Sequence, residues 1–213
     1  MPSAANNHQQ LISALLSRYP IVSDQVDRRE LTALLQLLAQ VLSKNVAGDV
    51  VELGCYVGTT SLFLRRVLDQ FAQDKQLHVY DSFAGLPEKT SPDMSASGVQ
   101  FVAGELHAKK DSLVQNFKHA GLQLPIIHKA WFSELTDQAM PVQIAFAFLD
   151  GDYYQSIKDS LRLVWPHMSP GSCIAIDDYA SEALPGARRA VDEFCANHGL
   201  QVVSRASLGI IQL

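Results

Sequence analysis

Residues 49–60 of the chain read Asp49-Val-Val-Glu-Leu-Gly-Cys-Tyr-Val-Gly-Thr-Thr60. The first five residues are mostly apolar and predict a short buried strand, and residues 59–71 have the apolar spacing of an amphipathic helix. Between them lie two glycines four positions apart, Gly54 and Gly58. Because glycine has no side chain and tolerates unusual dihedral angles, such a turn lets a ligand approach the backbone. The helix start adds unpaired N–H groups that suit a carboxylate or phosphate, so the stretch predicts the opening of a doubly wound nucleotide-binding sheet.

Composition indicates one α/β domain. The chain has 213 residues, of which 47% are hydrophobic, and its net charge is −5. An acidic chain with no basic cluster argues against a nucleic-acid partner. No apolar run approaches the roughly 20 residues that a membrane span needs, and residues 1–10 lack an apolar signal core. The three cysteines show neither metal spacing nor a pairing framework, so we expect a soluble, cytoplasmic protein with reduced thiols.

The rest of the chain alternates strand and helix patterns without a repeat. Residues 1–46 hold two helical stripes and are expected to form an N-terminal helical element: a packing layer on the sheet, a lid or a dimer surface. Residues 47–213 are expected to form the main domain. Its further strands are predicted at 77–81, 124–128, 143–149, 170–176, 202–203 and 208–213, and its further helices at 107–119, from 153 and at 185–195. The pattern predicts a mostly parallel seven-stranded α/β sheet with an antiparallel C-terminal strand.

The glycine spacing distinguishes between cofactors. A dinucleotide site needs G-x-G-x-x-G, whereas this turn reads G-x-x-x-G with Glu52 on the strand before it. A carboxylate suits a pyrophosphate badly but suits the amino group of a methionine-bearing cofactor. The pattern resembles the first motif of class I S-adenosylmethionine-dependent methyltransferases. The alternatives are a tight turn only, a nicotinamide dehydrogenase, which the missing third glycine disfavours, and a non-catalytic binding module.

Two later features fit the same cofactor. Asp81 ends the second strand 23 positions after Gly58, near the offset of about 20 residues at which an acidic residue binds ribose hydroxyls. Asp81 would also suit the turn that follows it. Trp131 or Phe132, after the third strand, could cover an adenine face or pack in the core. The Pro- and Gly-rich residues 84–106 are expected to rim the site as a long loop.

Carboxylates end two successive buried strands. Asp150 follows one, and Asp177 and Asp178 follow the next. Ligands of open α/β sheets bind at the carboxyl ends of strands, where these three would repel one another unless a cation neutralised them. Oxygen ligands favour a hard ion, Mg²⁺ first, although a simple turn is the alternative for Asp177 and Asp178. We expect Asp152, which is close by, to cap the following helix.

Five motifs in order strengthen the functional interpretation. They are residues 52–58, 81–87, 149–154, 177–179 and 186–194, and together they resemble the macrocin O-methyltransferase family of antibiotic-sugar methyltransferases over about residues 48–213. The glycine motif also resembles that of catechol O-methyltransferase, a more distant relative. The resemblance implies that Glu52, Gly54, Tyr56, Gly58, Thr60 and Asp81 bind S-adenosylmethionine and that Asp150, Asp177 and Asp178 bind Mg²⁺. We also expect Thr59, Ser82, Trp131 and Phe132 beside the cofactor.

Two departures from these families affect the substrate and the base. The N-terminal region is shorter than in the antibiotic enzymes, and Tyr153 stands where the catechol enzyme has a lysine base. Asp150 is the predicted catalytic base, with His107 and Tyr153 as weaker candidates. The expected activity is Mg²⁺-dependent methyl transfer to a hydroxyl of a small molecule, first a sugar diol of a glycosylated natural product or glycan, and alternatively a phenolic, catechol or hydroxamate acceptor. The N-terminal helices and the long loop leave room for a homodimer or higher homo-oligomer.

Overall fold

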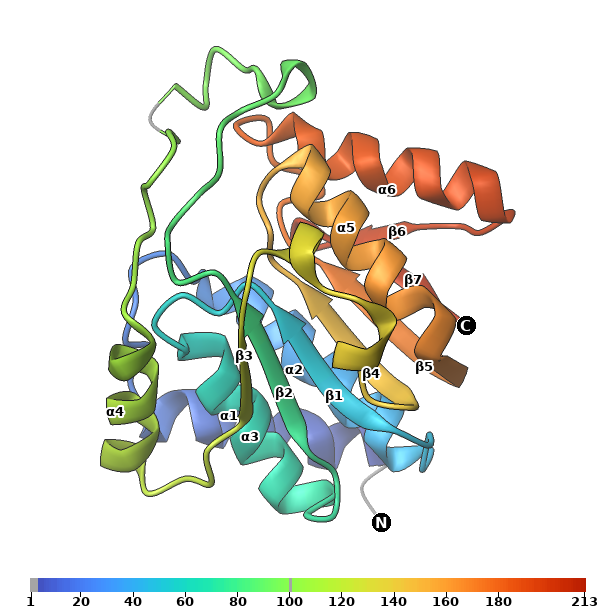
Figure 1. Cartoon of the computed structure of the whole chain (residues 1–213). Coiled ribbons are helices and arrows are strands. Elements are labelled where there is room, and N and C mark those ends of the chain that lie inside the picture. The colour runs from blue at the N-terminus through green and yellow to red at the C-terminus, as the bar shows by residue number, and fades with distance from the viewer. Residues whose placement is uncertain (1–3, 100) are drawn as a thin grey trace.

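The structure, a computed structural model, describes residues 4–99 and 101–213 (Figure 1). The expectations for residues 1–3 and for residue 100 of the long loop lie outside this range. The helices are α1 (Ala4–Arg18), α2 (Arg28–Ser43), α3 (Thr59–Phe71), α4 (Lys110–Ala120), α5 (Tyr154–Val164) and α6 (Pro185–His198). The strands are β1 (Asp49–Leu53), β2 (Leu77–Asp81), β3 (Ile126–Lys129), β4 (Ile144–Leu149), β5 (Met168–Ile176), β6 (Val203–Arg205) and β7 (Leu208–Gln212).

The strands form one sheet in the order β3-β2-β1-β4-β5-β7-β6. Strands β1 to β5 pair in parallel, and β7 runs antiparallel to both β5 and β6. The first strand, β1, lies inside the sheet; the chain then adds β2 and β3 on one side of it and returns to add β4 on the other side. This confirms the predicted mostly parallel, doubly wound α/β sheet with an antiparallel C-terminal end. The carboxyl ends of β1 and β4 meet at the switch point, where such sheets bind their ligands.

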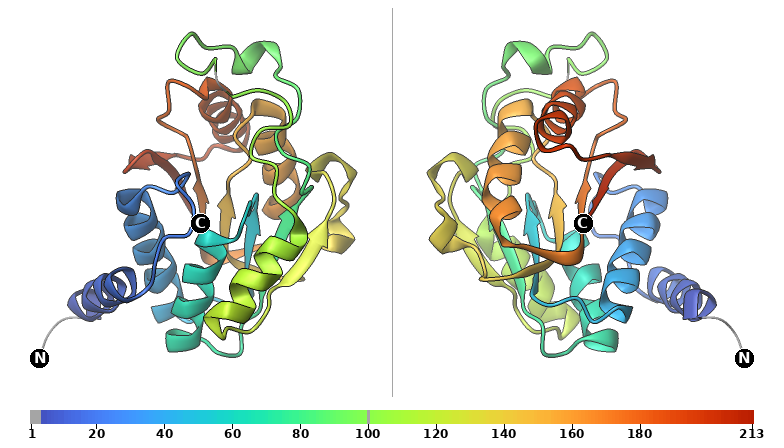
Figure 2. Two further views of the ribbon diagram at one scale, coloured as in Figure 1. Left: turned by 90° about the vertical axis from the view of Figure 1, so that its left-hand side faces the viewer. Right: turned by 90° about the vertical axis from the view of Figure 1, so that its right-hand side faces the viewer.

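Helices cover both faces of the sheet (Figure 2). Successive strand residues point to opposite faces, so Val50 packs in one core with α2, α3 and α4, whereas Val51 packs in the other with α5 and α6. All six residues of β4 are buried, as expected for a central parallel strand with helices on both sides. The strand ends that form the site therefore belong to a sheet that is packed on both faces.

The N-terminal helices lie on the α3 side. Leu35 and Leu38 of α2 are fully buried in the same core as β1 and β4. The Asp27 carboxylate caps α2 by accepting from the N–H groups of Arg29 and Glu30. α1 lies outermost in this layer (Figure 2). No helix among residues 4–99 and 101–213 combines the length and the apolarity that a membrane crossing needs.

The long loop arches beyond the carboxyl ends of the strands, near the beginnings of α5 and α6 (Figure 1). It contains one helical turn, Ser91–Asp93. Hydrogen bonds from the hydroxyls of Ser95 and Ser97 to the carbonyl of Glu182 join it to the segment before α6. The predicted start of the next helix at residue 107 was wrong, because Lys109 is still extended and α4 begins at Lys110.

Candidate active site

A cavity of about 470 Å³ opens at the carboxyl ends of the parallel strands. Its size falls within the range of about 300–1,000 Å³ that is usual for small-molecule sites. The lining residues come from the end of β1 and the turn after it, the segments after β2, β3, β4 and β5, the connection between α1 and α2 with the first turn of α2, and the long loop. Among the predicted cofactor residues, those that line the cavity are Glu52, Gly54, Tyr56, Thr59, Thr60, Asp81, Ser82, Trp131 and Phe132.

The two glycines of the turn have different tasks. Gly54 has φ +91°, and a Cβ at this position would lie 1.8 Å from the carbonyl oxygen of Asp150. Only glycine lets the turn approach the end of β4 so closely. Gly58 is the N-cap of α3 with φ +85°, and it faces Leu113 of α4 instead of the cavity. The structure therefore gives Gly58 a role in shaping the turn and does not bring it to the cavity wall.

Glu52 places an unpaired acceptor at the cavity wall. The side chain is fully buried, and one carboxylate oxygen accepts a hydrogen bond from the Ser61 hydroxyl. The other, Oε1, has no partner in the described residues, and neither has the buried hydroxyl of Thr59. Burial is the main cause that raises the pKa of Glu52 to about 8; the Ser61 hydrogen bond opposes it and the charge of Asp81 adds to it. Buried carboxylate oxygens in folded proteins nearly always have a hydrogen-bond partner. The ammonium of S-adenosylmethionine is a group that would pair with Oε1, so the predicted role of Glu52 agrees with this geometry.

Asp81 holds the cofactor turn in place. Its Oδ2 accepts from the N–H groups of Cys55 at 2.9 Å and Tyr56 at 3.0 Å, and its Oδ1 accepts from the N–H of Phe83 at 2.7 Å. The carboxylate is half-buried and also lines the cavity. Asp81 therefore stabilises the turn that follows β2, which was the alternative role predicted for it from the sequence. The ribose role stays a prediction that the same carboxylate can fulfil with its remaining lone pairs.

The two aromatic residues after β3 differ in exposure. Trp131 is 36% exposed, whereas Phe132 packs partly against the core on the α5 side. Both line the cavity beside Ala130 and Ser133. The core-packing alternative therefore holds in part for Phe132, and Trp131 offers the more accessible face for an adenine ring.

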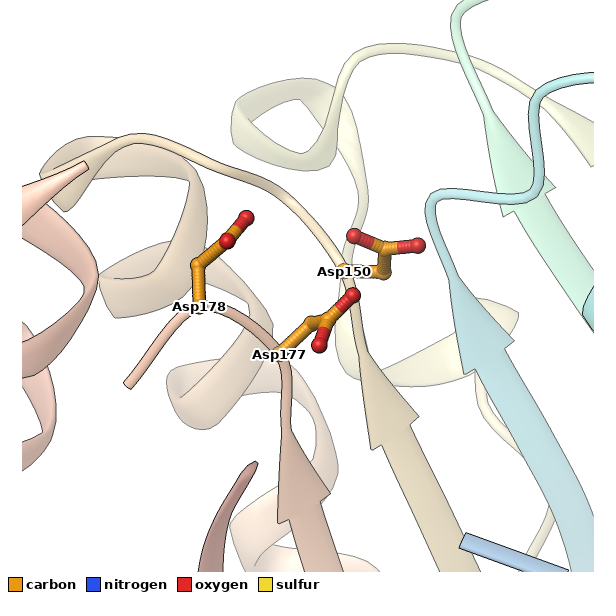
Figure 3. Close-up of side chains that lie close together, drawn as sticks. All are labelled: Asp150, Asp177 and Asp178. Carbon is orange, nitrogen blue, oxygen red and sulfur yellow. The ribbon is translucent and has the colours of Figure 1, made fainter. Parts of the chain in front are cut away.

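Three carboxylates converge at the ends of β4 and β5. One oxygen from each of Asp150, Asp177 and Asp178 lies within 4.8 Å of the others, and Figure 3 shows the three side chains at the ends of two neighbouring strands. The pKa of each of the three is raised, first by burial, and for Asp150 and Asp178 also by neighbouring carboxylates. An all-oxygen donor set whose charges repel one another fits a hard divalent cation such as Mg²⁺.

The expectation that Asp152 caps the following helix was wrong. Tyr153 is the N-cap of α5 and provides no side-chain hydrogen bond, while the N–H of Tyr154 donates to Asp93 of the long loop. Asp152 instead has φ +59° and lines the cavity. Burial, followed by the charges of Asp177 and Asp81, raises its pKa to about 7. Asp152 is therefore a further carboxylate of the site.

Two weaker base candidates lose support from the geometry. The hydroxyl of Tyr153 donates to the carbonyl of Phe101 at 3.1 Å, and burial, with nearby acidic charges, raises its pKa to about 12. His107 does not line the cavity. Asp150 remains the base predicted from the sequence, and Asp152 joins it as a second candidate.

Several lining residues were not identified from the sequence. Ser23, Gln25, Val26 and Glu30 come from the N-terminal element, for which a lid was one of the predicted alternatives, but none of these four residues was singled out. Burial, and then the charges of Asp177 and Asp27, raise the pKa of Glu30 to about 7. The acidic lining residues are Glu30, Glu52, Asp81, Glu88, Asp93, Asp150, Asp152, Asp159, Asp177 and Asp178.

The fold and the site together define an S-adenosylmethionine-dependent O-methyltransferase. The sequence profile of the family "Macrocin-O-methyltransferase (TylF)" matches residues 18–204. The chain belongs to this family.

Two curated relatives and one solved structure agree with this assignment. The 8-demethyl-8-(2,3-dimethoxy-alpha-L-rhamnosyl)-tetracenomycin-C 4'-O-methyltransferase of Streptomyces olivaceus is 30% identical over 187 residues, which cover 84% of this chain and 70% of that protein. The Mycinamicin III 3''-O-methyltransferase of Micromonospora griseorubida is 30% identical over 192 residues, which cover 85% and 74%. The solved structure of the O-methyltransferase NovP superposes with a TM-score of 0.75 at 22% identity over 98% of this chain and 97% of that chain.

Proposed function

We propose that the protein transfers the methyl group of S-adenosylmethionine to a hydroxyl of a sugar on a glycosylated natural product or glycan, with Mg²⁺ held by Asp150, Asp177 and Asp178. The observation that carries the proposal is a single cavity that contains both the glycine turn with Glu52 and the three-carboxylate cluster. The Streptomyces olivaceus relative is named for a rhamnosyl group, which supports a sugar acceptor.

The reaction needs alignment more than covalent help from the protein. Methyl transfer from a sulfonium to a hydroxyl is an in-line displacement, and alignment of two reactants can lower a barrier by about 7–11 kcal/mol. In this proposal Glu52 binds the cofactor's ammonium, Asp81 its ribose, and Trp131 with Phe132 its adenine. A bound Mg²⁺ would supply positive charge beside two neighbouring acceptor hydroxyls and lower the pKa of the one that reacts.

The proton of the acceptor hydroxyl has two candidate recipients. Asp150 is the predicted base and also a predicted metal ligand, so its lone pairs would serve two tasks. Asp152 lines the same cavity and makes no capping contact that would occupy its carboxylate. Separate Asp150→Asn and Asp152→Asn variants distinguish the two. If Asp152 is the base, Asp152→Asn lowers turnover at unchanged Mg²⁺ affinity; if Asp150 is the base, Asp152→Asn leaves turnover unchanged.

An acceptor screen tests the proposal. Vicinal sugar diols, catechols and hydroxamates are incubated with isotopically labelled S-adenosylmethionine and Mg²⁺, and the labelled product is identified by mass. We expect the label on the sugar diols. Methylation of catechols or hydroxamates without any sugar would support the second acceptor class instead.

The proposal also covers the cellular location and the oligomeric state of the protein. The three free cysteines are all buried, in keeping with a cytoplasmic location. The N-terminal helices and the long loop provide the surfaces for a homodimer, which light scattering at several protein concentrations would detect.

A further inference from the structure

The sheet fixes two of the three predicted metal ligands. The N–H of Asp150 donates to the carbonyl of Leu53 at 2.8 Å, which continues the pairing of β1 with β4. The N–H of Asp177 donates to the carbonyl of Leu149 at 2.8 Å, which continues the pairing of β4 with β5. Asp178, in contrast, lies two residues beyond the end of β5 and has φ +55°, which is uncommon for a non-glycine residue. Its position therefore depends on contacts outside the sheet.

The hairpin of β6 and β7 supplies such contacts. The N–H of Ala180 donates at 3.0 Å to the carbonyl of Ser207, in the turn between the two strands. The ring of Tyr179 packs so closely on Gly209 of β7 that a Cβ there would lie 2.8 Å from the Cγ of the tyrosine. The two residues that follow Asp178 thus both rest on this hairpin, which supports the backbone that carries the carboxylate.

The turn of the hairpin has a conformation that its own sequence does not favour. Ala206 has φ +51° and Ser207 has φ +67°. Two-residue hairpin turns with positive φ at both positions usually contain Asn, Asp or Gly, and glycine adopts positive φ most readily. Other residues keep such a conformation where surrounding contacts hold them in it. We therefore looked for the contacts that hold Ala206 and Ser207, and they come from α2.

Helix α2 binds the hairpin at two points. The Ser207 hydroxyl donates to Oε1 of Glu30, in the first turn of α2, and also lies 2.7 Å from the carbonyl of Ala206. The guanidinium of Arg205 donates to the side-chain oxygen of Gln36, two turns further along the same helix. Only the first contact involves the residue whose carbonyl supports the segment after β5.

We propose that Glu30 and Ser207 are positioning residues for the metal site. The hydrogen bond between them holds the hairpin turn, and the turn holds Asp178 within reach of the cation that Asp150 and Asp177 bind. The inference rests on the proposed function, because it concerns the same metal. It gives the N-terminal element a part in forming the metal site in addition to its packing on the sheet.

Binding of Mn²⁺, a hard divalent ion, tests the inference without turnover. Electron paramagnetic resonance of free Mn²⁺ during a titration gives the Kd. Ser207→Gly removes the hydroxyl and suits the positive φ of the turn, so the fold should remain intact. Partners that orient a metal ligand typically change metal affinity by about 10- to 100-fold when they are lost, so Ser207→Gly and Glu30→Ala should each raise the Mn²⁺ Kd by about tenfold or more. Calorimetry should show S-adenosylmethionine affinity within about threefold of wild type in both, since neither residue belongs to the predicted cofactor positions.

Glu30→Gln separates positioning from charge. Its amide oxygen can still accept from the Ser207 hydroxyl, although the side chain is neutral. The Mn²⁺ Kd should therefore stay within about threefold of wild type, well below the change for a lost partner. A rise as large as that in Glu30→Ala would show that Glu30 acts through its charge, and would overturn the positioning role.

Two further variants are the controls. Gln36→Ala removes the acceptor of Arg205, which is the other contact between α2 and the hairpin. Asp74→Ala removes an exposed carboxylate before β2, at the opposite end of the sheet. Neither should change the Mn²⁺ Kd by more than about threefold. An effect of Gln36→Ala equal to that of Ser207→Gly would mean that any loosening of the hairpin weakens the site, and would contradict the specific link.

The titration also separates a failure of this inference from a failure of the proposed function. If wild type binds Mn²⁺ and both Glu30→Ala and Ser207→Gly bind it with the same Kd, the inference is wrong and the metal proposal stands. If wild type binds no Mn²⁺, the metal proposal is wrong and the inference falls with it.

Discussion

The carboxylate of Asp93 accepts a hydrogen bond of 2.6 Å from the backbone N–H of Tyr154, 61 positions further along the chain. Asp93 is 1% exposed, and its other oxygen accepts from the N–H and the hydroxyl of Thr90. A Cβ on Gly186 at the start of α6 would overlap the Asp93 carboxylate. The long loop is therefore fixed at one point to both α5 and α6, and this contact holds the cavity's outer wall.

Replacing Asp93 with alanine should release that wall. The N–H of Tyr154 would lose its partner in a buried setting, at a cost of about 1–3 kcal/mol in the free energy of unfolding. Backbone amides of residues 94–99 and 101–106 should then exchange faster and gain less protection when cofactor and acceptor bind. Denaturant unfolding and hydrogen exchange measure the two effects. Asp93→Asn, which keeps one oxygen acceptor, is the matched control and should lose less; unchanged exchange in Asp93→Ala would show that the anchor does not order the loop.

Asp81→Ala should weaken S-adenosylmethionine binding. A charge-assisted hydrogen bond to a ribose hydroxyl is worth about 1.5–3 kcal/mol, which corresponds to roughly 10- to 100-fold in Kd. The same change removes the acceptor for the N–H groups of Cys55 and Tyr56, so part of the loss comes from a less ordered turn. Calorimetry with S-adenosylmethionine measures the affinity. Loss of the ribose contact should weaken binding of adenosine only, whereas a less ordered turn should weaken binding of methionine as well. Unchanged affinity in a folded variant would remove Asp81 from the cofactor site.

Glu52 should make the ligand-free protein less stable as the pH rises. Its pKa is about 8 in the folded protein against an ordinary value of 4.5, so the folded state retains a proton that the unfolded state has lost between these pH values. Stability from this group is therefore fully present below about pH 4.5 and is lost as the pH rises through 8. Glu52→Gln does not ionise at this position and lacks that loss. The Tm of wild type relative to Glu52→Gln should fall from pH 5 to pH 8; a difference that does not change with pH would contradict the buried, proton-retaining state.

The local parts of the site were predictable from the sequence. Strand 49–53 and helix 59–71 lie where the pattern predicted them, because a buried run, a glycine pair and an amphipathic stripe are all local signals. The convergence of Asp150, Asp177 and Asp178 was also predictable. Parallel strands that are neighbours bring their carboxyl ends to one edge, so the position of each residue in its strand was sufficient.

The parts that depend on long-range contacts were not predictable. The sequence assigned the capping of α5 to Asp152 because it is adjacent, whereas Asp93 of the long loop accepts from Tyr154. Likewise, the helical stripe of α2 placed its leucines in the core but did not show that Glu30 reaches the cavity. The spacing of apolar residues tells which face of a helix is buried. It gives no information about which distant part of the chain, here the cavity, the first turn of the helix will contact.

The most direct test of the account is methyl transfer to the sugar acceptor after exhaustive chelation. We expect labelled methyl transfer to stop with EDTA and to return with added Mg²⁺. Asp177→Asn and Asp178→Asn should each lower turnover by about 100-fold or more while calorimetry shows S-adenosylmethionine affinity within about threefold of wild type, and Asp74→Asn should change neither. Full turnover in the chelated enzyme would contradict the metal-dependent mechanism and leave Asp150 or Asp152 as the base of a metal-independent methyltransferase.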